Sequence, residues 1–103
     1  MKVIHYQKVE SQVVPMRGAE RVSIRRPLAV ADGVPTFTMR VFTFEAGGHT
    51  PYHRHDYEHE VFVLTGRGWV LFEGGRKRLE PGVVTFVEPN EWQIGRASCR
   101  ERV

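Results

Sequence analysis

The sequence has almost no cysteine and no long apolar run. One cysteine, Cys99, stands among 103 residues, so a disulfide cannot form within the chain and no zinc-type cysteine spacing is present. No stretch of about 18 apolar residues could span a bilayer. The first ten residues are polar and lack the apolar centre of a signal sequence. We therefore expect a cytoplasmic protein with no membrane partner.

The basic residues are too scattered to indicate a nucleic-acid-binding surface. The formal net charge is +3, from 15 basic and 12 acidic residues. Short basic clusters occur at residues 76–78 and at Arg100 with Arg102, whereas nucleic-acid binders more often show a basic stripe interleaved with stacking aromatics. We expect no nucleic acid partner. A chain of this length has room for one domain with one core.

Short β-branched and aromatic runs, separated by glycine and proline, fill the chain, and helical periodicity is absent. Such runs predict strands, and many short strands between tight turns are typical of an antiparallel sandwich or barrel. The fold class predicted is all-β. Between Glu60 and Lys77 we predict two consecutive hairpins, which turn at residues 66–68 and 74–75. The predicted strand runs are residues 22–25, 37–45, 60–65, 69–73 and 83–87.

The last ten residues depart from the strand pattern. In residues 94–103, arginines, Ser98 and Cys99 stand where the alternation of apolar and polar residues typical of a strand would continue. The segment resembles the in-frame translation of a common sequencing adapter. Such scars do not belong to the fold. We therefore predict a single barrel domain over residues 1–93 and a non-native tail over 94–103, with a natural basic tail as the alternative.

A cluster of histidines is the most informative feature of the chain. Three of the five histidines fall within residues 53–59. Residues two apart in a strand project to the same face, so we predict that His53 and His55 point together into the barrel and share one ion. His59 follows across a short turn that can bring it back to the pair. We prefer a metal site to an exposed pair on a surface strand, because the third histidine completes a ligand set.

Acidic and tyrosine side chains surround this cluster. Three imidazoles suit zinc, copper, iron or nickel and leave coordination positions open for water, dioxygen or substrate. Glu58 and Glu60 are alternative ligands, or they orient a ligating ring by accepting its second proton. Strand parity puts Glu60 on the face opposite His59 if both lie in one strand. Tyr57 and Glu58 at the rim are candidates for moving protons.

Other residues have both a functional and a structural interpretation. His49, four residues before His53, either lines the cavity mouth or is merely solvated, and we favour the solvated position. Four aromatic residues either wall a small-molecule pocket or form the core, which is the more common role inside a barrel. They are Phe62, Trp69, Phe72 and Phe86.

Two motifs in the second half of the chain resemble those of the cupin superfamily. The first consists of Gly47, five residues, His53-x-His55, four residues, Glu60, five residues and Gly66. The second begins at Pro81-Gly82 and continues through residues 86–93. The resemblance implies a cupin-type double-stranded β-helix, or jelly-roll, barrel.

Within that superfamily, H-x-H-x-x-x-H resembles small monodomain cupins that bind manganese or iron on four histidines. The resemblance assigns His53, His55 and His59 as three ligands and puts the fourth at Gln93. A glutamine amide is a weak ligand, and its codon differs from a histidine codon in the third base alone, so we predict histidine at this position in the natural gene. The family continues for about two further strands, which implies a barrel incomplete at its C-terminal strands and an exposed edge that favours a homodimer.

The resemblance implies a small-molecule substrate or ligand and one divalent metal ion, manganese or iron, with zinc or nickel as alternatives. The first functional hypothesis is a dioxygenase-like oxidoreductase that uses oxygen on a small organic substrate. The second is a non-catalytic module that binds a small molecule or a metal. The third is an isomerase with histidine as general base, which three converging histidines disfavour because a base needs one well-placed imidazole. Fold alone does not separate them.

Overall fold

The computed structural model describes residues 1–98 as an all-β domain with two short 3₁₀ turns. Residues 99–103, which include Cys99 and half of the predicted tail, lie outside the described residues. The all-β prediction is confirmed, and every predicted strand run overlaps an observed strand. The elements are η1 (Tyr6–Lys8), β1 (Gln12–Val13), β2 (Glu20–Leu28), η2 (Val30–Asp32), β3 (Met39–His49), β4 (His59–Phe62), β5 (Gly68–Phe72), β6 (Gly75–Leu79), β7 (Val84–Val87) and β8 (Gln93–Ala97).

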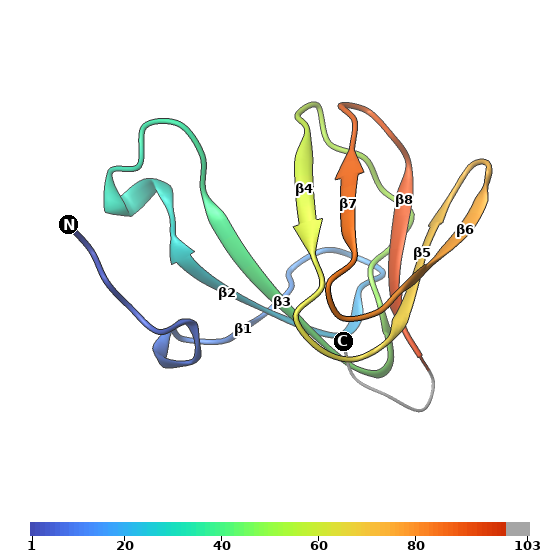
Figure 1. Cartoon of the computed structure of the whole chain (residues 1–103), viewed down its shortest axis with the longest axis horizontal. Coiled ribbons are helices and arrows are strands. Elements are labelled where there is room, and N and C mark those ends of the chain that lie inside the picture. Colours follow the sequence, from blue (N-terminus) through green and yellow to red (C-terminus); the bar gives the residue numbers. More distant parts are fainter. Residues whose placement is uncertain (99–103) are drawn as a thin grey trace.

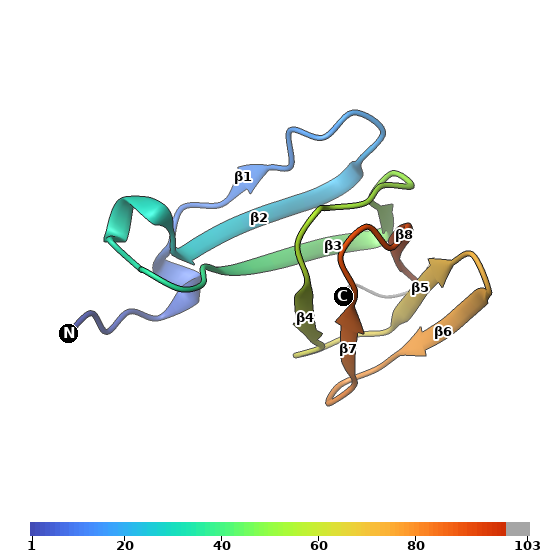
Figure 2. The same cartoon turned by 90° about the horizontal axis from the view of Figure 1, so that it is seen from above.

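The strands of residues 1–98 form two antiparallel sheets. The larger sheet has the order β1-β2-β3-β8-β5-β6, and the smaller one pairs β4 with β7. In Figure 1 the small sheet stands beside β8, β5 and β6, while β2 and β3 extend away from it toward the N-terminus. Figure 2 shows the same long arm from above. This arrangement agrees with the predicted jelly-roll barrel.

One of the two predicted hairpins is confirmed and the other is wrong. β5 and β6 pair from Gly68↔Leu79 to Phe72↔Gly75, as the turn at residues 74–75 predicts. β4 does not pair with β5, because the chain crosses from the small sheet to the large one at the turn around Gly66. β4 pairs instead with β7. Local alternation predicts that a strand exists, but the crossover decides which strand lies beside it.

Strand β8 includes residues 94–97, which the sequence pattern places outside the domain. It lies between β3 and β5 and pairs with β5 along its whole length. The side chain of Ala97 is only 1% exposed, whereas Arg96 is exposed on the other face. The charged side chain of Arg96 lies on the outer face of the sheet. It therefore does not interrupt the row of side chains that β8 contributes to the inner face. The non-native origin of residues 94–103 stays a prediction.

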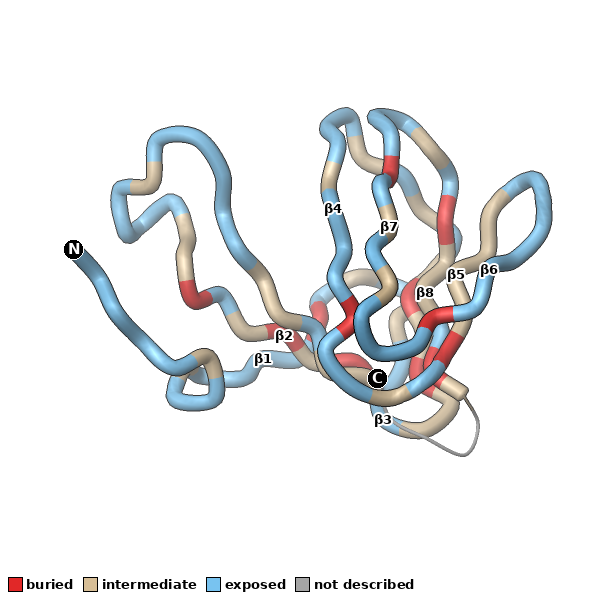
Figure 3. The backbone as a smooth tube through the Cα atoms, in the orientation of Figure 1, coloured by how far each residue is buried: buried red, intermediate tan, exposed pale blue. Residues whose placement is uncertain are grey.

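The hydrophobic core cluster consists of Val14, Val22 and Ile24, with Met16, Ala19 and Phe44 packed against it. Other buried hydrophobic residues, Val63, Leu79, Val87 and Ala97, lie in or next to β4, β6, β7 and β8. Figure 3 shows the buried positions as separate red segments along the chain. Neither 3₁₀ turn in the described part of the chain has the length or apolar character needed to cross a membrane.

We expect Ala97→Glu to lower the free energy of unfolding by about 3 kcal/mol or more, because it buries a carboxylate without a partner. The same substitution at Arg96, one residue away on the exposed face, should change it by less than about 1 kcal/mol. Urea denaturation followed by tryptophan fluorescence measures both values. Similar small effects for the two variants would show that β8 is not part of the folded sheet.

Candidate functional site

The loop between β3 and β4 carries two of the three clustered histidines. We predicted that His53 lies in a strand. Instead it forms an isolated bridge to Gln93, the first residue of β8. The bridge has two backbone hydrogen bonds, from His53 N to Gln93 O at 3.1 Å and from Gln93 N to His53 O at 2.9 Å. His55 lies two residues further on, outside any strand. The bridge therefore ties the histidine loop to the large sheet.

The three imidazole rings lie beside one another, although only one belongs to a strand. The ring centroids of His53 and His55 are 4.9 Å apart, and those of His55 and His59 are 5.6 Å apart, each pair edge-on at 73°. His59 opens β4 and is half-buried, whereas Glu60 next to it is exposed. The structure thus brings His53, His55 and His59 together and places Glu60 on the other face of the strand.

Hydrogen bonds orient two of these rings. His53 Nδ1 donates to the Pro51 carbonyl at 2.7 Å, so in the neutral ring the lone pair is on Nε2. The Gln93 amide nitrogen lies 3.0 Å from His59 Nε2 and donates to it. His59 Nδ1 is buried and has no hydrogen-bond partner among residues 1–98. Gln93 therefore occupies the ring nitrogen that a metal ion would otherwise take.

The surroundings keep the two inner rings uncharged. Burial is the main cause that lowers the pKa of His55, followed by electrostatic interaction with His53 and Arg40, while Asp56 acts in the opposite direction. Burial also lowers the pKa of His59 most, with further contributions from His55 and Arg40. Neutral imidazole is the form that binds a metal. The sequence did not single out Arg40, because only folding brings β3 close to the cluster.

The three side chains are of the right chemical type to bind a divalent ion, but they are not arranged around one position. His53 exposes a lone pair, and the pKa shifts favour neutral His55 and His59. Within residues 1–98, however, no group of three or more histidine, cysteine or acidic side chains is arranged to hold a metal. The edge-on rings and the amide on His59 explain this difference. Coordination would require the Gln93 amide to move and the rings to turn.

The other predicted residues divide between the cluster and the surface. Tyr57 stacks on His55 at 4.8 Å and 18°, and its ring is 6.3 Å from that of His59. Glu58 is exposed. His49 lies away from the cluster, with Nε2 3.7 Å from the Glu20 carboxylate. Of these residues, Tyr57 is the one whose ring contacts the histidines.

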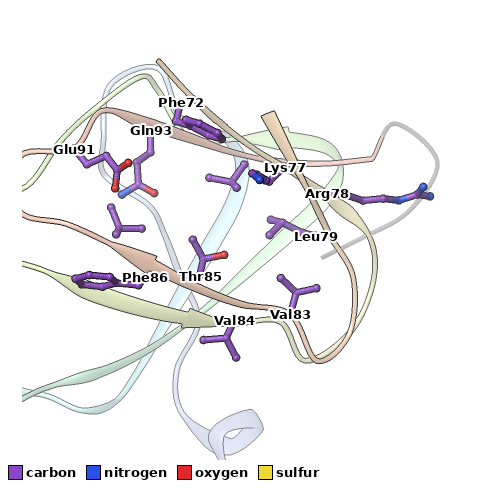
Figure 4. Close-up of a pocket in the computed structure, with 12 residues that line it drawn as sticks. Phe72, Lys77, Arg78, Leu79, Val83, Val84, Thr85, Phe86, Glu91 and Gln93 are labelled. Atoms are coloured by element: carbon purple, nitrogen blue, oxygen red, sulfur yellow. The ribbon is translucent and has the colours of Figure 1, made fainter. Parts of the chain in front are cut away.

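A cavity of about 390 Å³ opens between β7 and the pair β5 and β6. Figure 4 shows Gln93 and Glu91 at one end, with Phe72 and Phe86 on opposite walls. Two of the four aromatic residues therefore wall the cavity. Trp69 does not, because it pairs with Arg96 on the outer face and carries the Arg76 guanidinium 4.2 Å from its ring centroid. Since Gln93 also contacts His59, the cavity adjoins the histidine cluster.

A family model matches the second half of the chain, and a solved structure matches nearly all of it. The model described as Cupin domain matches residues 40–97, which include the histidine cluster and Gln93. The polyketide cyclase RemF from Streptomyces resistomycificus superposes with a TM-score of 0.93 and 27% sequence identity. That match covers 99% of this chain and 73% of the cyclase.

Two further structures share the fold at lower identity. Ectoine synthase from P. lautus has a TM-score of 0.79 and 20% identity, over 99% of this chain and 72% of that one. A predicted oxalate decarboxylase from Thermotoga maritima has a TM-score of 0.78 and 20% identity, over 95% of this chain and 88% of that one. These likenesses show the fold alone. No curated protein matches the chain.

We expect Gln93→His to tighten the binding of Zn²⁺ and Mn²⁺ about tenfold or more, because it removes the amide from His59 and adds a fourth imidazole. His59→Ala should weaken binding by a similar factor. His5→Ala is the matched control, since His5 lies at η1, where its ring accepts from Gln7 N. Competition with a fluorescent chelator measures the affinities. Equal affinity in all four proteins would contradict a metal site at this cluster.

Proposed function

The chain belongs to the cupin family, and from that premise we propose that it binds one divalent metal ion and closes a ring in a polyketide-type substrate. The observation that carries the proposal is the match to a polyketide cyclase, with a TM-score of 0.93 over 99% of the chain. That match also has the highest sequence identity, 27%, of the three structures described above, the others being 20% identical. Ring closure is therefore the reaction that the similarity favours.

The proposed ligands are His53, His55 and His59, with Gln93 at the fourth position. The lone pair that His53 exposes and the lowered pKa values of His55 and His59 support this assignment. Manganese or iron is expected, with zinc or nickel as alternatives, since imidazole accepts all of these ions. When bound, such an ion supplies Lewis-acid polarisation of a substrate carbonyl. Glu60 is the less suitable ligand, because it lies on the exposed face of β4.

The residues around the cluster have separate roles in ring closure. In such a reaction a carbon between two carbonyls loses a proton and bonds to another carbonyl carbon. Tyr57 stacks on His55 and is positioned to move a proton at the cluster. The apolar walls of the cavity, including Phe72, Leu79 and Val87, hold the carbon chain and exclude water from it. Glu58 is exposed and is the weaker candidate.

Oxygen-dependent oxidation is the second candidate function. It is supported by the ligand set, because three histidines leave coordination positions for both dioxygen and substrate. A non-catalytic binding module and an isomerase use the same fold, and a homodimer is compatible with each function. Metal dependence and oxygen uptake distinguish these possibilities.

We expect the metal-loaded protein to convert a synthetic linear poly-β-ketone thioester into a cyclic product, detected by chromatography and mass spectrometry. Activity should disappear after chelation and return with Mn²⁺, Fe²⁺, Zn²⁺ or Ni²⁺. Tyr57→Phe should lower the turnover number about a hundredfold, the lower range for loss of a general acid or base, while elemental analysis shows unchanged metal content. His59→Ala should lose both metal and activity.

The control is His5→Ala, which should keep metal and activity. Oxygen consumption with substrate, in place of cyclisation, would favour the oxidoreductase. Tight binding of the thioester without any turnover would favour the binding module. Cyclisation that survives complete chelation would overturn the metal dependence.

A further inference from the structure

We propose that Lys77 binds an anionic group at the end of the substrate that lies farthest from the histidines. The inference rests on the proposed function and deepens it, because it names the substrate class as an extended, mainly apolar molecule with a terminal carboxylate or enolate. Lys77 would be a specificity-determining residue that sets which end of the substrate meets the metal ligands.

Strand register places Lys77 on the inner face of the large sheet. Val70 pairs with Lys77 on one side and with Gly95 on the other. Phe72 pairs with Gln93 in the neighbouring row, two residues along the strand. Residues two apart share a face, so Lys77 faces the same side as Gln93. Both side chains line the cavity.

The polar residues of the cavity differ in charge from one end to the other. Glu91 lies beside Gln93 at the histidine end, as Figure 4 shows, and its carboxylate accepts from Glu88 N at 3.1 Å. Lys77 lies on β6, on the other side of Phe72. In the metal-free chain Glu91 disfavours an anion at the histidine end, whereas the Lys77 ammonium attracts one. In the metal-loaded chain of the proposed function, a substrate carbonyl lies at the histidine end, and Lys77 binds the anionic group at the other end of the same substrate.

The size of the cavity suits such a ligand. Strands lie about 4.8 Å apart and residues about 3.3 Å apart along a strand. Lys77 is two strands and two residues from Gln93, so their backbones are separated by about 12 Å. A volume of about 390 Å³ is within the range of small-molecule sites. An extended chain of carbonyl-bearing carbons, or a molecule with two fused rings, can span this distance.

Lys77 is available for this role. Among residues 1–98 it makes no ion pair with a carboxylate, and the wall beside it is formed by Val70 and Leu79. Arg76 projects toward Trp69 on the outer face, with its guanidinium carbon 4.2 Å from the ring centroid. Arg78 also lies over Trp69, at 5.9 Å, but it is one of the residues that line the cavity, as Figure 4 shows. The adjacent residue Arg76 therefore provides a control of equal charge on the opposite face.

The test uses two fluorescent probes of the same shape, 6-hydroxy-2-naphthoic acid and its neutral methyl ester. We expect the unaltered chain to bind the acid more tightly than the ester. Lys77→Met should weaken binding of the acid about fivefold, the upper range for an exposed ion pair, and leave the ester unchanged. Lys77→Arg should restore the preference, and Arg76→Met should keep it. The preference should shrink as salt is raised.

Each titration is done with chelated protein and again with Zn²⁺ added, so that this inference and the proposed function can fail separately. Loss of cyclisation or metal binding, with the Lys77-dependent preference intact, would overturn only the proposed function. Equal affinities for acid and ester in the unaltered chain would overturn the role of Lys77. The role of Lys77 would also be overturned if Arg76→Met weakened acid binding as much as Lys77→Met does.

Discussion

Two backbone hydrogen bonds between His53 and Gln93 hold together the parts of the site. They join the loop that carries His53 and His55 to strand β8, which lies in the middle of the large sheet. On the outside of the bridge, Tyr52 stacks on Trp92 at 4.9 Å and 12°, and the Arg54 guanidinium lies 4.9 Å from the Trp92 ring centroid. This aromatic and cationic stack packs next to the bridge on the exposed side. Together with the backbone hydrogen bond from Asn90 N to the His55 carbonyl, the bridge holds the loop histidines in place relative to the sheets.

Gln93 connects the two functional regions. Its backbone forms the bridge, its amide donates to His59, and its side chain lines one end of the cavity. Gln93 therefore lies between the cavity and the ring of His59. The neutral state of His55 and His59 results from their burial and from the charge of Arg40. The same surroundings that favour neutral imidazoles also leave His59 Nδ1 without a hydrogen-bond partner among the residues that the structure describes.

The inner and outer faces of the large sheet carry basic residues for different reasons. On the outer face, Arg76 and Arg78 lie over the ring of Trp69, where cation–π contact keeps charge at the solvent boundary. On the inner face, Lys77 stands at the edge of an otherwise mainly apolar wall. One sequence cluster, residues 76–78, is thus divided between two environments by strand parity. A basic run in sequence does not imply one basic surface.

By itself, the sequence determined the all-β class, the approximate strands and turns, and the β5–β6 hairpin, because alternation and glycine turns are local properties. It also singled out His53, His55 and His59, whose residue types and close spacing are visible without a structure. Tertiary structure alone decided that β4 pairs with β7, that residues 94–97 complete the inner face of β8, and that Arg40 lies near the cluster. It also placed Lys77 on the same inner face of the large sheet as Gln93. These relations join residues distant in the chain, and they depend on which faces are buried together, which local patterns do not encode.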